Sequence, residues 1–120
     1  MNRPKIMIVD DNTKILYAFE SLLEKEGCIS VLAENGNQAL TLLSRENPET
    51  VFLDISLPDV CGLDLIKKMK IMIPLLTVIV IVEDGIEDVT KEALKEGAFA
   101  CLQKPLSVSN IRDILSKIKS

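Results

Sequence analysis

Histidine is absent from this 120-residue sequence, and so is tryptophan. Without histidine the chain has no Ser-His-Asp or Cys-His triad, lacks the ligand of most zinc sites and cannot carry a phosphohistidine. Cysteine is scarce, and Cys28, Cys61 and Cys101 lie far apart in the sequence. An odd, scattered set of this kind indicates neither a disulfide framework nor a zinc site. We therefore interpret the three cysteines as structural residues.

Positive charge is also in the minority, with 14 Lys and Arg against 18 Asp and Glu, a net charge of -4. Affinity for a nucleic-acid backbone comes from clustered Lys and Arg, so this domain is not expected to bind nucleic acid directly. The sequence has no apolar run of membrane-spanning length, and its first residues do not resemble a signal peptide. We expect a cytoplasmic protein that does not bind a membrane.

Aromatic residues make up only 3% of the sequence, although hydrophobic residues reach 48%. The core must therefore be built from Ile, Leu and Val, as is usual for parallel sheets covered by helices. A chain of this length can bury enough surface to fold without disulfides or metals. We expect one domain over residues 1–120.

Short apolar runs alternate with segments of helical periodicity along the whole chain. The runs predict strands at 5–9, 30–33, 50–53, 75–82 and 99–102, and the periodic segments predict helices at 13–26, 37–45, 63–74, 86–96 and 111–118. This alternation predicts an α/β fold with a parallel sheet and helices on both faces. Because no Gly-x-Gly-x-x-Gly follows the first strand, we expect the flavodoxin-like (βα)5 arrangement, a doubly wound sheet with strand order 2-1-3-4-5.

Acidic side chains end two strands that this order makes neighbours. Asp10 and Asp11 follow the first predicted strand, and Asp54 ends the third. Three carboxylates within about 4 to 6 Å of one another would repel by a few kcal/mol per pair, so positive charge is needed there. The only metal ligands predicted at this position are hard oxygen atoms, which favour Mg²⁺ or Mn²⁺. Lys104, after the fifth strand, is the natural lysine for the same site.

A divalent cation held by few carboxylates has open positions for phosphate oxygens, and a neighbouring carboxylate can attack phosphorus. We interpret Asp54 as that nucleophile, Asp10 and Asp11 as metal ligands, and Lys104 as the group that neutralises charge on the phosphoryl oxygens. The competing interpretation is that the acids only solvate strand ends. It explains any one of them more easily than all of them together with Lys104.

Four segments resemble the motifs of response regulator receiver domains: 8–11, 52–58 with Gly62, 92–99 and 104–105. The resemblance covers essentially the whole chain. It implies that Asp54 accepts a phosphoryl group from a histidine kinase, a phosphotransfer protein or a small phosphodonor, and that water later removes it. It also implies Mg²⁺ bound by Asp10, Asp11, Asp54 and the backbone carbonyl of Ser56, and a cis bond before Pro105.

Three positions depart from the family pattern. Receivers usually end the fourth strand in Thr or Ser, where this chain has Val82, and the following residue, usually small, is Glu83. The aromatic residue usual in the fifth strand is replaced by Cys101. Both halves of the usual hydroxyl-to-aromatic relay are therefore missing. Either signalling runs through the loop at 83–85 and the predicted helix at 86–96, which has only a narrow apolar stripe, or the domain reports phosphorylation in another way.

Two other functions are compatible with the same fold. One is a docking or dimerisation module that works without phosphorylation, suggested by Val82, Glu83 and Cys101. The other is a Mg²⁺-dependent phosphatase, which is disfavoured because Ser56 stands where a general acid would be expected, two residues after Asp54. The effector, an output domain beyond Ser120, and excision from a longer regulator or hybrid kinase stay open. By family analogy a dimer would use the fourth helix, fifth strand and fifth helix.

Overall fold

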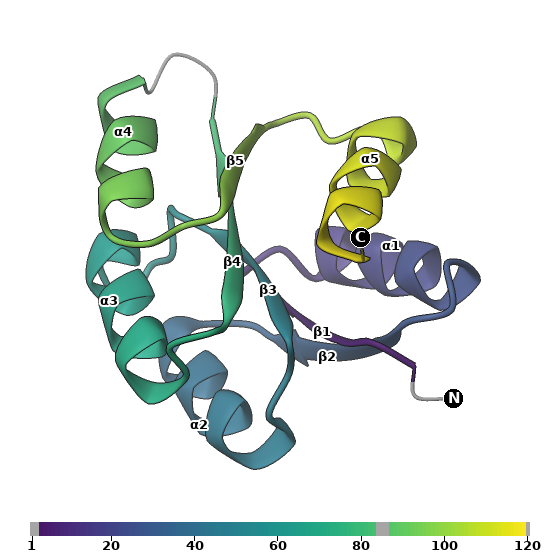
Figure 1. The fold of residues 1–120 in the computed structure, drawn as a ribbon, viewed down its shortest axis with the longest axis horizontal. Helices are drawn as coiled ribbons and strands as arrows, with labels where there is room; N and C mark the ends of the chain where they lie inside the picture. Colours follow the sequence, from purple (N-terminus) through teal and green to yellow (C-terminus); the bar gives the residue numbers. More distant parts are fainter. Residues whose placement is uncertain (1–2, 84–86, 120) are drawn as a thin grey trace.

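The structure is a computed structural model that describes residues 3–83 and 87–119. Within these ranges, five strands and five helices alternate along the chain (Figure 1). The strands are β1 (Lys5–Val9), β2 (Ile29–Ala33), β3 (Thr50–Asp54), β4 (Thr77–Val82) and β5 (Ala100–Gln103). The helices are α1 (Thr13–Lys25), α2 (Gly36–Glu46), α3 (Gly62–Met72), α4 (Glu87–Lys95) and α5 (Val108–Lys119).

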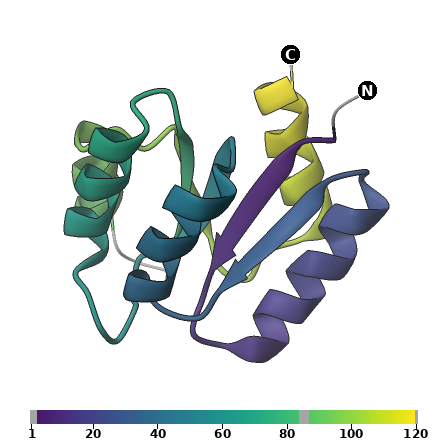
Figure 2. The same ribbon diagram turned by 90° about the horizontal axis from the view of Figure 1, so that it is seen from below.

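The strands form one parallel sheet in the order β2-β1-β3-β4-β5, which confirms the predicted fold class and strand order. Helices α1 and α5 cover one face, and α2, α3 and α4 cover the other (Figure 1). Figure 2 shows β1 and β2 side by side and pointing the same way. In a parallel sheet the carboxyl ends of all strands meet at one edge, and β1 and β3 are neighbours there.

Each face of the sheet has its own apolar core, and the side chains of β3 alternate between the two. Phe52 belongs to the core under α1 and α5, whereas Val51 and Leu53 belong to the core under the other three helices. The Phe52 ring lies 5.0 Å from the ring of Phe19 on α1. All five residues of β3 are buried, which explains why apolar side chains fill successive positions at Val51, Phe52 and Leu53 instead of alternate ones.

The fourth strand is shorter at its start than predicted. The predicted strand began at Leu75, but β4 begins at Thr77 and the Leu75 side chain is 93% exposed. The backbone N–H of Leu76 donates to the carbonyl of Ile73, so the chain makes a turn around Pro74 before the strand begins. An apolar run does not by itself separate an exposed turn from the strand that follows it.

Other boundaries shift by only a few residues. Strand β5 begins and ends one residue later than predicted, at Ala100 and Gln103. Helix α5 starts earlier than its apolar periodicity indicated, because the Ser107 hydroxyl accepts a hydrogen bond from the N–H of Asn110 and caps the first turn. The predicted start of the fourth helix at Ile86 and most of the 83–85 loop lie outside the described residues.

In the described part of the chain, no helix combines the length and the apolar character needed to cross a membrane.

Candidate functional site

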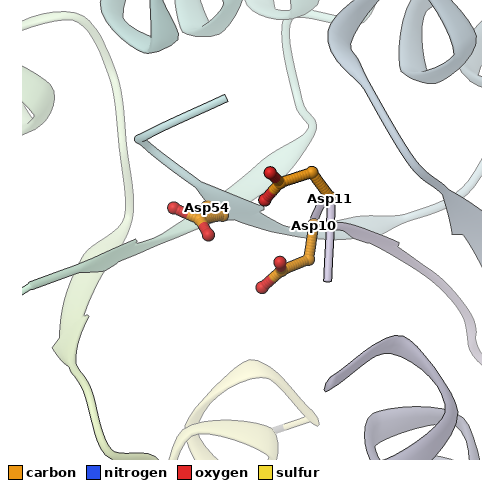
Figure 3. Close-up of side chains that lie close together, drawn as sticks. All are labelled: Asp10, Asp11 and Asp54. Carbon is orange, nitrogen blue, oxygen red and sulfur yellow. The ribbon is translucent and has the colours of Figure 1, made fainter. Parts of the chain in front are cut away.

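Three carboxylates gather at the carboxyl edge of the sheet. Asp54 is the last residue of β3, and Asp10 and Asp11 directly follow the end of β1 (Figure 3). One oxygen from each can be chosen so that all three lie within 4.8 Å of one another. Asp10 and Asp54 are buried, whereas Asp11 is exposed. The structure therefore brings together the three acids that the sequence predicted as one group.

The same type of local hydrogen bond orients both buried carboxylates. Oδ1 of Asp10 accepts a hydrogen bond of 2.9 Å from the backbone N–H of Asn12. Oδ1 of Asp54 likewise accepts one of 2.9 Å from the backbone N–H of Ser56. In each case an Asx turn ends the strand and fixes one oxygen of the acid. The second oxygen, Oδ2, is left to face the centre of the site.

Lys104 supplies positive charge to this centre. Its Nζ lies 2.9 Å from Oδ2 of Asp54 and 3.9 Å from Oδ2 of Asp10. Its backbone N–H donates to the carbonyl of Val82 at 2.9 Å and so fixes the start of the side chain. The peptide bond between Lys104 and Pro105 is cis, as the resemblance implied.

The acids also keep Lys104 in its charged form. Burial acts to lower the pKa of Lys104, but the hydrogen bond and charge of Asp54, together with the charges of Asp10 and Glu83, outweigh it and raise the pKa. The side chain is therefore an ammonium at neutral pH, able to partner negative charge.

Asp10 has the least satisfied carboxylate of the group. Its residue is 1% exposed, and within the described residues its Oδ2 has no hydrogen-bond partner. Burial raises the pKa of Asp10, and the charges of Asp54 and Asp11 add to the rise, against the lowering by the Asn12 N–H and Lys104. A buried carboxylate oxygen that accepts no hydrogen bond is costly, and the nearest positive charge, the ammonium of Lys104, is 3.9 Å away. These hard oxygen donors therefore fit a divalent cation such as Mg²⁺ or Mn²⁺.

Val82 and Glu83, two of the three positions that depart from the receiver pattern, lie at the carboxyl end of β4. Asp54 pairs with Ile81 in the sheet, and Val82 follows as the buried last residue of β4. Glu83 is exposed beside it. No hydroxyl stands at this position of the site.

Cys101 lies on β5 in register with Val80, and its side chain packs against the core under α2, α3 and α4. Its Sγ contacts the carbonyl oxygen of Thr90 on α4 at 3.9 Å. Burial raises the pKa of the Cys101 thiol, which keeps it protonated. A half-buried, protonated thiol agrees with the structural interpretation of this cysteine.

Sequence reasoning missed the role of Asp59, which joins the loop after β3 to helix α2. Its Oδ1 accepts from the N–H of Gly36 at 2.9 Å, and its Oδ2 accepts from the N–H of Asn37 at 3.1 Å. These bonds, the one from Gly36 foremost, lower the pKa of Asp59. No local pattern pairs residues so far apart. By contrast, the cap that Asn12 makes on α1 follows a recognisable pattern, an Asn just before a helix.

Two glycines let the 55–61 loop pack closely. A Cβ at Gly36 would lie 2.3 Å from Cγ2 of Val60, and a Cβ at Gly62 would lie 2.5 Å from the carbonyl oxygen of Ile55. The loop that carries Ser56 is thus seated against α2 by Asp59 and Val60, and against α3 at Gly62.

Comparisons with known proteins agree with this geometry. The family model for the response regulator receiver domain matches residues 6–116. Sporulation initiation phosphotransferase F of Bacillus subtilis is 34% identical over 117 residues, covering 98% of this chain and 94% of that protein. The solved CheY-like response regulator receiver domain protein of Methanospirillum hungatei is 31% identical, with a TM-score of 0.89 over 98% of this chain and 92% of that one.

Another similar structure carries a modified aspartic acid and bound ligands. It is a response regulator from Burkholderia pseudomallei with a phosphorylated aspartic acid, a calcium ion and citrate. It is 27% identical, with a TM-score of 0.86 over 97% of this chain and 71% of that one.

Several relatives are much longer than this chain. The DNA-binding transcriptional regulator NtrC of Proteus hauseri is 30% identical over 117 residues, which make up 98% of this chain but only 25% of that protein. The similarity to such regulators therefore concerns one of their domains. The fold, the grouped acids and Lys104, and the match of the family model over residues 6–116 lead to one conclusion: this chain belongs to the response regulator receiver domain family.

Proposed function

We propose that Asp54 is the phosphoacceptor of this receiver and that its reaction requires a divalent cation. The observation that carries the proposal is the position of Lys104, whose Nζ lies 2.9 Å from Oδ2 of Asp54 and 3.9 Å from Oδ2 of Asp10. A cation placed beside two buried carboxylates can neutralise a phosphoryl group that arrives on one of them. Receivers take part in phosphorylation-based signalling, and this arrangement gives the present chain the means to do so.

In the proposed step, a carboxylate oxygen of Asp54 attacks the phosphorus of the donor. A P–O bond forms to Asp54 while the bond from phosphorus to the leaving group breaks, and the electron pair of that bond stays with the leaving group. For a phosphohistidine donor the leaving group is the imidazole nitrogen. Lys104 is 25% exposed on its side chain and can shift from Oδ2 of Asp54 to a phosphoryl oxygen as charge spreads there.

Asp10 and Asp11 would hold the cation together with Asp54 and the backbone carbonyl of Ser56. Mg²⁺, or Mn²⁺ in its place, would supply charge to the phosphoryl oxygens and fix their orientation. The unpartnered Oδ2 of Asp10 supports this assignment. So does the calcium ion found with a phosphorylated aspartic acid in the similar Burkholderia pseudomallei regulator.

The domain would catalyse only its own phosphorylation and dephosphorylation. Attack of water on the phosphorus of the aspartyl phosphate breaks the P–O bond to Asp54 and releases inorganic phosphate. Ser56, two residues after Asp54, offers no carboxyl to act as a general acid, so turnover of a separate phosphate ester is not part of the proposal.

The proposed partners are a histidine kinase or phosphotransfer protein as donor and an effector or output domain as receiver of the signal. The name of the Bacillus subtilis relative, a sporulation initiation phosphotransferase, favours a place within a relay. NtrC, a DNA-binding regulator about four times as long as this chain, favours an output domain. A cytoplasmic location remains a prediction from the sequence, and a dimer through α4, β5 and α5 remains a prediction by family analogy.

A docking or dimerisation module that needs no phosphorylation is the second candidate. Val82 is buried at the end of β4 and offers no hydroxyl to a phosphoryl group, and Cys101 replaces the usual aromatic residue on β5. On this account partner binding would be the same with Asp54 replaced by Asn.

Intact-mass spectrometry after incubation with phosphoramidate tests the proposal. One phosphoryl adduct in Mg²⁺, lost when the metal is removed with EDTA, is the expected result. If the protein binds Mg²⁺, as a calorimetric titration would show, and yet acquires no adduct, the docking module becomes the better account.

A further inference from the structure

A second feature of the site is a cavity of about 580 Å³ between α1, the end of β4 and the segment that joins β5 to α5. Its walls are mostly apolar and come from α1, α5 and the segment between β5 and α5, among them Ile15, Phe19, Leu22, Leu106 and Ile111. Its volume lies within the range of about 300–1,000 Å³ that is typical of small-molecule sites. The cavity can therefore hold an organic molecule with an apolar body.

One end of the cavity is polar and reaches the acidic site. Asp10, Glu83 and Lys104 line it there. Figure 3 shows the Asp10 side chain directed to the side of the sheet on which α1 and α5 lie, away from Asp11. Asp10, whose buried Oδ2 has no hydrogen-bond donor among the described residues, therefore lies in the wall of a cavity that is otherwise mostly apolar.

The charges at this end favour a cation. Asp10 and Glu83 are acids, and the ammonium of Lys104 is already hydrogen-bonded to Asp54 at 2.9 Å. An anionic ligand would meet Asp10 and Glu83, whereas an ammonium or amidinium could donate to Oδ2 of Asp10 and lie beside the exposed carboxylate of Glu83. Shape and charge thus select a molecule with a cationic head and an apolar tail.

We propose that this cavity is a binding site for a small amphipathic organic cation, an arylalkyl amine or amidine. Its cationic group would bind Asp10, and its apolar part would fill the space between α1 and α5. Since Asp10 would also hold the divalent cation, the two ligands would exclude each other. In this respect alone the inference rests on the proposed function. Such a ligand would act as an inhibitor of phosphorylation by displacing the metal.

The test is a titration of the metal-free protein with 2-(2-naphthyl)ethylamine, followed by ¹⁵N–¹H correlation spectra. Its matched probes are the neutral 2-(2-naphthyl)ethanol and the anionic 2-naphthylacetate. The amine is expected to shift the amides of Ile15, Phe19, Leu22 and Ile111 and to bind more tightly than either probe. Glu83→Gln should weaken binding of the amine roughly two- to fivefold and leave the alcohol unaffected. Mg²⁺ should raise the apparent Kd of the amine.

Substitutions on α1 locate the site. Ala18 is exposed on the helix and lines the cavity, so Ala18→Trp should fill it and abolish binding. Ser21→Trp, one turn along the same exposed surface and outside the cavity lining, should leave binding intact.

Equal affinity for amine and alcohol, shifts that survive Ala18→Trp, or no shifts at all would each overturn the inference. None of these results bears on Asp54, whose phosphorylation is measured separately and without the amine.

Discussion

The ammonium of Lys104 and the carboxylate of Asp54 lie 2.9 Å apart, although 50 residues separate them in the sequence. The two strands concerned, β5 and β3, are not neighbours, because β4 lies between them. Lys104 therefore reaches across the end of β4, where its own N–H is bound to the carbonyl of Val82. The pair depends on the whole strand order, and the proposed phosphorylation of Asp54 depends on the pair.

Replacing Lys104 by Met is expected to slow phosphorylation by small donors by roughly 10²- to 10³-fold, because one charged contact to the phosphoryl oxygens is lost. Affinity for Mg²⁺ should stay the same or rise, since a positive charge has been removed from beside the acids. Adduct formation over time and calorimetric Mg²⁺ binding measure the two effects. The matched control is Lys67→Met, whose exposed ammonium pairs with Glu96 on the surface. Loss of metal binding in Lys104→Met would show that the lysine has a structural role instead.

Asp59 gives the fold a dependence on pH. Because its pKa is lowered in the folded state from the ordinary value of 3.8, its stabilising bonds to Gly36 and Asn37 are fully present above that value and are lost as the pH falls through the folded pKa. Asp59→Asn should therefore lower the urea midpoint at pH 7, and the difference from wild type should shrink below about pH 4. Exposed Asp113→Asn is the control. A difference that stays constant with pH would mean that charge at Asp59 does not matter.

Gly36 and Gly62 are expected to respond differently to substitution. Gly36→Ala would bring a Cβ to 2.3 Å from the side chain of Val60, so it should cost about 1–3 kcal/mol of unfolding free energy. Val60→Ala in the same chain should recover part of that cost. Gly62→Ala meets the backbone carbonyl of Ile55 at 2.5 Å, and Ile55→Ala should not rescue it. Urea unfolding of the single and double variants measures this, and simple additivity at Gly36 and Val60 would contradict the packing described.

Val82→Thr tests the missing hydroxyl. A hydroxyl buried at this position should lower the unfolding free energy by about 1–3 kcal/mol, because a polar group replaces a buried methyl group. After phosphorylation, amide shifts in the variant should extend to Thr90 on α4 and Cys101 on β5, whereas in wild type they should stay near Asp54 and Lys104. Correlation spectra before and after phosphoramidate measure this. Shifts at Thr90 and Cys101 in wild type of the same size as in the variant would show that the hydroxyl is not needed.

Much of the fold and of the site follows from local sequence signals. Unbroken apolar runs predict strands buried on both faces, and the alternation with helices limits the topology to a few choices, of which the observed order is one. The same order makes Asp10 and Asp54 neighbours before any coordinates are known. Lys104, directly after the fifth strand, falls at the same edge for the same reason.

Contacts between distant segments could not be predicted in this way. The hydrogen bonds between Asp59 and the start of α2 join residues more than 20 positions apart, in two segments that share no sequence periodicity. The turn that leaves Leu75 exposed has an apolar sequence, so the sequence does not distinguish it from the strand that follows. The cavity beside Asp10 depends on the distance between α1 and α5. That distance is set by how the side chains pack in three dimensions, which the types of single residues do not reveal.

Locating the phosphoryl group on the chain tests the central claim most directly. Wild type, Asp54→Ala and Asp59→Ala would each be incubated with Mg²⁺ and phosphoramidate and then weighed intact, with the adduct assigned by fragmentation. The account predicts one adduct on Asp54 in wild type, the same adduct in Asp59→Ala, and none in Asp54→Ala. An adduct that persists in Asp54→Ala, or is absent from wild type although Mg²⁺ binds, would contradict it.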